Sequence, residues 1–91
     1  MDKVCRNLII RNKLGLHARA ATKLAQLTQE FDSTITVRQG EQCVNAASVM
    51  CLMLLASQQG KSVEVCAEGK DAQAALDAVS ALFEDRFEED E

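Results

Sequence analysis

The residues best suited to chemistry in this chain lie in one short segment around His17, the only histidine. Gly15 stands two positions before His17, and Arg19 stands two positions after it. An imidazole titrates near neutral pH, so its neutral form can attack a phosphoryl group. His17 is therefore a candidate phosphoryl acceptor that would carry the group covalently.

The same segment predicts a place for the phosphate. Apolar spacing and abundant alanine predict a helix from Ala18 to about Glu30, directly after the glycine turn. The first N–H groups of a helix have no partner within the helix and carry partial positive charge, so they bind anions. We expect the backbone N–H groups of Ala18 and Arg19 to receive the phosphoryl oxygens.

A simpler interpretation of these residues stays open. A lone histidine is often a surface side chain or a helix cap, and Arg19 fits a solvated arginine in a first helical turn. A cation there is opposed by the helix dipole, but by less than about 1 kcal/mol. The combination of His17 and Arg19 at a helix start, rather than either residue alone, favours the phosphate site.

The elements that must position this site follow from periodicity and turn residues. Their predicted order is β-α-β-β-α-β-α, which indicates an α+β fold with helices on one face of a sheet. Ser48 and Asp71 are the expected N-caps of the second and third helices. The predicted strands span residues 4–11, 34–38, 42–45 and 62–68, and the predicted helices span residues 18–30, 47–57 and 72–83.

The second predicted helix is apolar on every side, from Val49 to Leu55. A short helix on a sheet needs apolar residues only on the side that faces the sheet. One interpretation is that loops cover the remainder. The other is an exposed, methionine-bearing patch for docking proteins, which includes Val49, Met50 and Met53.

Charge is distributed unevenly along the chain. Residues 84–91 hold six acids and one arginine, whereas residues 1–29 have a net charge of +5. The basic half favours an acidic protein partner over nucleic acid, because three phenylalanines are the only aromatic side chains. We interpret residues 1–84 as one domain and residues 85–91 as an acidic, solvating tail.

The four cysteines contain no CxxC pair, so no metal site and no cofactor are expected. We expect them to be reduced and to act as small apolar side chains. No signal peptide is apparent, and the longest apolar run covers only residues 49–56. The sequence therefore predicts a cytoplasmic protein without a membrane partner, and a monomer by default.

The chain resembles the HPr family, the histidine-containing phosphocarriers of the bacterial phosphotransferase system. The resemblance covers essentially the whole chain and is closest to the nitrogen-branch members, through Asn12-Lys13-Leu14-Gly15, Ala18 and the acidic ending after Ala81-Leu82-Phe83. It rests on the segment Gly15-Leu16-His17-Ala18-Arg19, on Phe31, Ser48 and Gly60, and on the turn Ala67-Glu68-Gly69.

This resemblance implies a fold, a reaction and partners. The implied fold is an open-faced β-sandwich, with a four-stranded antiparallel sheet and three helices on one side. His17 would accept a phosphoryl group on Nδ1 from enzyme I of the nitrogen branch and pass it to an enzyme IIA, without turnover chemistry of its own. Arg19 matches the family's active-site arginine. The positions that match the family's docking face are Ala18, Arg19, Val49, Met50 and Met53.

Two positions limit what the family implies. Ser48 matches a serine that a regulatory kinase phosphorylates in some Gram-positive members, but we do not expect that regulation in a nitrogen-branch protein. The family usually has proline where this chain has Ala20, so its first helical turn is expected to be less rigid.

Two other classes of function stay open beside the phosphocarrier. One is a regulatory binding protein of the same fold that acts through the Val49–Met53 patch without phosphorylation. The other is a small metal or nucleic-acid binder, which the missing CxxC pair and the scarce aromatic residues disfavour.

Overall fold

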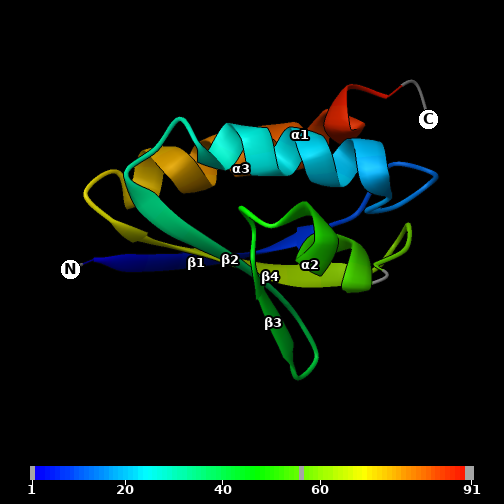
Figure 1. The fold of residues 1–91 in the computed structure, drawn as a ribbon, viewed down its shortest axis with the longest axis horizontal. Coiled ribbons are helices and arrows are strands. Elements are labelled where there is room, and N and C mark those ends of the chain that lie inside the picture. The colour runs from blue at the N-terminus through cyan, green and yellow to red at the C-terminus, as the bar shows by residue number, and fades with distance from the viewer. Residues whose placement is uncertain (1, 56, 90–91) are drawn as a thin grey trace.

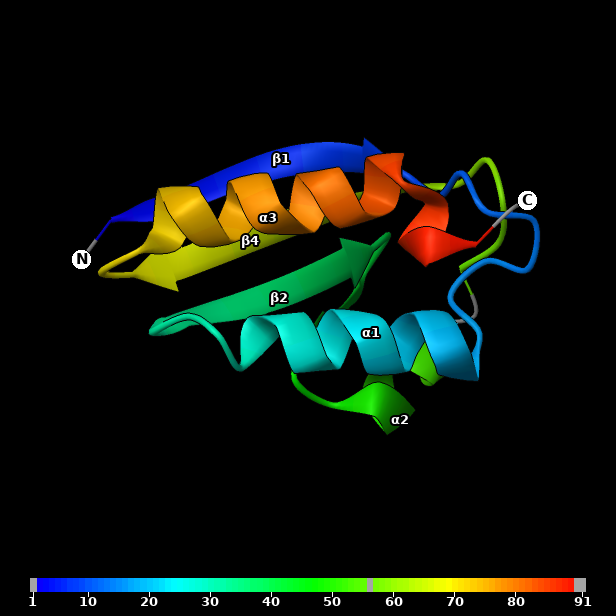
Figure 2. The same cartoon turned by 90° about the horizontal axis from the view of Figure 1, so that it is seen from above.

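A computed structural model describes residues 2–55 and 57–89 of the 91-residue chain. Three helices and a four-stranded sheet form two layers, with α1 and α3 side by side over the sheet (Figures 1 and 2). The strands are β1 (Lys3–Ile9), β2 (Ser33–Gln39), β3 (Gln42–Asn45) and β4 (Ser62–Gly69), and the helices are α1 (Ala18–Thr28), α2 (Val49–Leu54), α3 (Ala72–Glu84) and a final 3₁₀ turn, η1 (Arg86–Glu88).

The sheet is antiparallel throughout, with strand order β1-β4-β2-β3. The three helices cover one face, so the predicted α+β open-faced sandwich is confirmed. Period-two alternation decides which strand residues face the helices. Alternate apolar side chains from three of the strands enter the core, among them Leu8, Ile35, Val37, Val63 and Val65.

Arg6 is the polar exception on the helix-facing side of β1, as its position in the alternation predicts. It stays exposed, because β1 is an edge strand. Its guanidinium donates to Ser80 Oγ at 2.7 Å and pairs with the Asp77 carboxylate at 3.1 Å, so it ties β1 to α3.

Helix α2 is shorter than the predicted range of residues 47–57. Ser48 is its N-cap as predicted, because Ser48 Oγ accepts from the N–H of Cys51 at 3.2 Å. The N–H of Ala47 donates to Asn45 Oδ1 at 2.8 Å, which holds Ala47 in the preceding turn. Ala56, inside the predicted range, lies outside the described residues. No helix within the described ranges has both the length and the apolar character to cross a bilayer.

Asp71 is the N-cap residue of α3, as predicted, but its side chain makes no capping hydrogen bond. Its carboxylate accepts from the N–H of Asp32 at 3.0 Å and from Ser33 Oγ at 2.5 Å. These two hydrogen bonds, that from Ser33 first, lower the pKa of Asp71. The carboxylate therefore fastens the start of β2 to the start of α3.

The segment of residues 86–89 is folded onto the domain. Phe87 is fully buried, and its ring centroid lies 4.8 Å from that of Phe83. Lys23 Nζ donates to the carbonyl of Phe87 at 3.0 Å and pairs with Glu88 at 3.1 Å. The expectation of a merely solvating tail is therefore wrong for residues 86–89. The boundary at residue 84 stays a prediction, and Asp90 and Glu91 lie outside the described residues.

Cys5 and Cys66 face each other in the β1–β4 ladder and form a disulfide with an S–S distance of 2.13 Å. The expectation that all four cysteines are reduced is therefore wrong for this pair. The two residues are 61 positions apart, and only the strand register brings them together. Cys43 and Cys51 are free thiols.

Replacing Cys5 with serine should destabilise the oxidised protein. A cross-link over this span removes conformational entropy from the unfolded chain worth about 4 kcal/mol. Urea unfolding should show that loss for Cys5→Ser without reductant, and almost none when both proteins are reduced. Cys43→Ser is the matched control and should behave like wild type. Equal stability of wild type with and without reductant would contradict the cross-link.

Candidate functional site

The loop before α1 is held by a close approach that only glycine permits. Gly15 has φ +68°, and a Cβ on it would lie 2.3 Å from the carbonyl oxygen of Ser57. The N–H of Leu16 donates to that same oxygen at 3.0 Å, and the Leu16 side chain is buried. These contacts hold the loop against Ser57, in the segment after α2. They therefore fix the next residue, His17, at the start of α1.

His17 is the N-cap of α1, with extended backbone angles of φ −76° and ψ −179°. Its carbonyl accepts from the N–H of Ala21 at 2.9 Å, while its side chain makes no capping bond. Within the described residues, the N–H groups of Ala18 and Arg19 have no hydrogen-bond acceptor, and the Arg19 guanidinium forms no ion pair. Ala18 and Arg19 are exposed residues next to His17, so the predicted anion-binding groups lie on an exposed part of the chain without a partner among the described residues.

The ring of His17 is held by a carboxylate from the other end of the chain. His17 Nε2 lies 2.5 Å from Glu89 Oε2. Asn12, which is fully buried, donates from Nδ2 to Glu89 Oε1 at 3.0 Å and to the Gly15 carbonyl at 2.7 Å. One amide thus links the glycine turn, the carboxylate and, through the carboxylate, the imidazole.

Electrostatics at this contact favour an ionised Glu89. Burial raises its pKa, but hydrogen bonds from Asn12 and His17, with the positive charges of His17 and Arg19, lower it more. The net pKa of Glu89 lies below its ordinary value. An ionised carboxylate can only accept hydrogen bonds, so Nε2 is the donor, and in the neutral form of the ring Nδ1 is the nitrogen without a proton.

Sequence reasoning missed Asn12 and Glu89 as site residues. Asn12 was named only in the segment that resembles the nitrogen-branch members, and Glu89 was only one of several tail acids. The sequence signal that could have linked Glu89 to the site was the opposite charge of the two ends of the chain. In the structure that charge is paired within the chain, since Arg11 lies 3.4 Å from Glu84 and Lys23 lies 3.1 Å from Glu88.

The apolar second helix is exposed, as one of its two interpretations proposes. Helix α2 packs beside α1, and its Leu52 is buried while Met50 and Met53 are 75% and 45% exposed. Val49 is half-buried. The structure adds Leu54, 73% exposed, which the sequence did not single out. We call Val49, Met50, Met53 and Leu54 the α2 patch.

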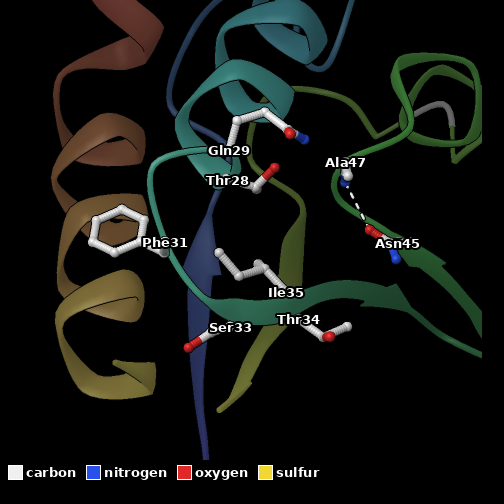
Figure 3. Close-up of a pocket in the computed structure, with 8 residues that line it drawn as sticks. All are labelled: Thr28, Gln29, Phe31, Ser33, Thr34, Ile35, Asn45 and Ala47. Atoms are coloured by element: carbon white, nitrogen blue, oxygen red, sulfur yellow. Dashed lines mark hydrogen bonds between the residues drawn. The ribbon is translucent and has the colours of Figure 1, made fainter. Parts of the chain in front are cut away.

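Two other features lack the means for the same chemistry. A groove of about 260 Å³ lies at the opposite end of α1 from His17 (Figure 3), and none of its lining side chains is ionisable. Those residues are Thr28, Gln29, Phe31, Ser33, Thr34, Ile35, Asn45 and Ala47. On the sheet, Cys5, Cys66 and Glu64 place potential metal-ligand atoms within 4.8 Å of one another, but the two sulfurs are bonded to each other.

Comparisons with known proteins match nearly the whole chain. A family model described as the PTS HPr component phosphorylation site matches residues 4–85. The chain is 53% identical over 89 residues to phosphocarrier protein NPr of Shewanella violacea, covering 98% of each chain. It is 49% identical over 83 residues to phosphocarrier protein HPr of Xylella fastidiosa strain 9a5c, covering 91% of this chain and 93% of the relative. The crystal structure of HPr-C-His from Thermoanaerobacter tengcongensis superposes with a TM-score of 0.90 at 40% identity, covering all of both chains.

The hydrogen bonds of Glu89 should make the free energy of unfolding decrease as the pH falls into the acid range. Its folded-state pKa is lowered from 4.5, so its contribution is fully present above that value and is lost as the pH falls through the lowered pKa. The difference in unfolding free energy between wild type and Glu89→Gln should shrink as the pH falls below 4.5 and through the lowered pKa. Urea unfolding at each pH measures it, with Glu88→Gln as control. A difference unchanged down to pH 2 would contradict the ionised contact.

Proposed function

Because the chain belongs to the HPr family of phosphotransferase-system phosphocarriers, we propose that His17 accepts a phosphoryl group from the nitrogen-branch enzyme I and passes it to an enzyme IIA. The transfer takes place in the cytoplasm. The chain is a covalent relay between two proteins and has no independent turnover. The observation that carries the proposal is the position of its only histidine, at the N-cap of α1.

The geometry at the start of α1 supports this assignment of roles. His17 Nε2 is engaged by Glu89, which leaves Nδ1 as the nucleophile. The exposed N–H groups of Ala18 and Arg19 supply hydrogen bonds and partial positive charge for the phosphoryl oxygens. The Arg19 guanidinium adds a full positive charge and a planar set of donors suited to phosphate.

The α2 patch supports a partner that docks beside this site. Three of its four side chains are exposed apolar groups on a helix that packs against α1. Exposed methionines adapt to differently shaped surfaces, which suits one carrier that meets a donor and an acceptor in turn. We assign partner binding to Ala18, Arg19, Val49, Met50 and Met53, with Leu54 added by its exposure.

The nitrogen branch is proposed from the closeness of the chain to an NPr protein and from its acidic ending. Ala20 replaces the family's usual proline in the first turn of α1, where it is buried and helical. Alanine is a good helix former, and the turn is already anchored through Gly15 and Leu16. We therefore expect a working site without the proline.

Phosphorylation at His17 is tested by the intact mass of the protein after incubation with phosphoenolpyruvate and nitrogen-branch enzyme I. Wild type should gain one acid-labile phosphoryl group, and His17→Ala should gain none, because the only imidazole is removed. Circular dichroism and urea unfolding serve as the folding control. Equal labelling of His17→Ala would overturn the proposal.

A lysine in place of Met50 should weaken the encounter with enzyme I without unfolding the carrier, because Met50 is 75% exposed. A charge placed in an apolar docking surface should raise the KM for the carrier about tenfold, the effect of losing one of the few interface residues that contribute more than about 1 kcal/mol. Gln42→Lys adds the same charge on the exposed hairpin strand β3 and is the matched control. Equal KM values for the two variants would contradict a role of α2 in docking.

The same mutants test the second candidate, a regulatory binding protein that uses the α2 patch without phosphorylation. The exposed patch is the observation that favours it. In that case wild type would gain no mass with an enzyme I that labels another carrier. His17→Ala would then bind its target as tightly as wild type, while Met50→Lys would not.

A further inference from the structure

The carboxylate of Glu89 is placed on His17 by packed structure rather than by chance contact of a loose chain end. Phe87, two residues before it, is fully buried against Phe83. Lys23 of α1 holds this segment twice, through the carbonyl of Phe87 and the carboxylate of Glu88. The Glu89 side chain itself is only 10% exposed.

The backbone that leads to Glu89 supports the same conclusion. Arg86, Phe87 and Glu88 have positive φ values of 53°, 54° and 65°. Left-handed geometry is unfavourable for residues other than glycine and persists only where surrounding contacts hold it. The buried ring of Phe87 supplies such a contact. The turn that it stabilises directs Glu89, the residue after the turn, toward the imidazole of His17.

The acceptor atoms of Glu89 are divided between two donors. Oε2 faces His17 Nε2 at 2.5 Å, and Oε1 accepts from Asn12 Nδ2 at 3.0 Å. The carboxylate is therefore fixed on the side of the ring away from Nδ1. Within the described residues it makes no contact with the N–H groups of Ala18 and Arg19, so the proposed phosphate site stays open.

We infer that Glu89 is a positioning residue for phosphoryl transfer: it accepts the Nε2 proton of His17 and so holds the ring in the tautomer whose Nδ1 lone pair is free. Asn12 orients Glu89 in turn. This inference deepens the proposed function and rests on it. The chemistry parallels other histidines whose second nitrogen is bonded to a carboxylate that fixes tautomer and orientation.

The transfer step balances without release of a proton. The Nδ1 lone pair forms the N–P bond while the bond from phosphorus to the donor protein's leaving atom breaks, and that electron pair departs with the donor. The proton stays on Nε2, so the product is an N-phosphoryl imidazolium. Its positive charge faces the Glu89 carboxylate. In the onward transfer the N–P bond breaks and its electron pair returns to Nδ1.

The role is tested by pairing a tautomer measurement with a rate measurement on four proteins. Wild type is compared with Glu89→Gln, which removes the charge at similar size, and with Glu89→Asp, which keeps it. Glu88→Gln removes the neighbouring carboxylate, which pairs with Lys23 and not with His17. Nitrogen-15 NMR reports the tautomer without ambiguity, because the chain has a single histidine. Rapid-quench labelling by enzyme I and phosphoenolpyruvate reports kcat and KM.

The inference predicts an Nε2–H tautomer in wild type and in Glu88→Gln, and a mixture of both tautomers in Glu89→Gln. Glu89→Gln should also lower kcat at least about tenfold with little change in KM, because the ring is misoriented while the docking surface is intact. Glu89→Asp should recover part of that loss. Urea unfolding verifies that each variant is folded.

Three outcomes would overturn it, and they separate its failure from that of the proposed function. Equal kcat values for wild type and Glu89→Gln would overturn the role of Glu89 alone. Faster labelling of Glu89→Gln would also overturn it, since the carboxylate would then obstruct the site. No labelling of wild type, with the Nε2–H tautomer intact, would overturn the proposed function and with it any part for Glu89 in transfer.

Discussion

The close approach of Gly15 to the carbonyl of Ser57 is the constraint on which the rest of the site depends. A Cβ atom at residue 15 would lie 2.3 Å from that oxygen, so the loop can pack against Ser57 only with glycine at this position. With the loop in place, Leu16 enters the core and His17 becomes the N-cap of α1. The helix start then offers the N–H groups that we propose to bind the phosphoryl oxygens.

Charge distribution connects this loop to the far end of the chain. The basic N-terminal third and the acidic C-terminus are paired within one molecule through Arg11, Lys23 and His17. That pairing would be weak on an open surface. Here the burial of Phe87 fixes the acidic segment, so one of its carboxylates, Glu89, reaches the imidazole. Arg19 forms no ion pair within the described residues.

The fold was predictable to a large extent because its signals are local. Alternation in β4 and the apolar stripe of α3 follow directly from residue spacing, and Ser48 marks the start of α2. The bounds of α2 were less predictable, because its apolar run continues past the point where the helix ends. The local signal at Asp71 was overruled by Asp32 and Ser33, which bind its carboxylate across 38 residues or more.

The site was predictable only on one side of the imidazole. The order Gly15, His17, Arg19 indicates a helix start with an anion site, since these residues are neighbours in the sequence. Glu89 lies 72 positions from His17, and Cys66 lies 61 positions from Cys5. Neither pairing has a local pattern, because a tertiary turn and a strand register create them.

The most direct test of the central claim is to identify which ring nitrogen of His17 carries the phosphoryl group. Phosphorus-31 NMR of the protein labelled with nitrogen-15 histidine would show coupling of phosphorus to one ring nitrogen of His17. We predict coupling to Nδ1, because Glu89, which Asn12 orients, binds Nε2. Coupling to Nε2 would contradict it, since that atom would first have to leave the carboxylate that the folded C-terminus brings to it.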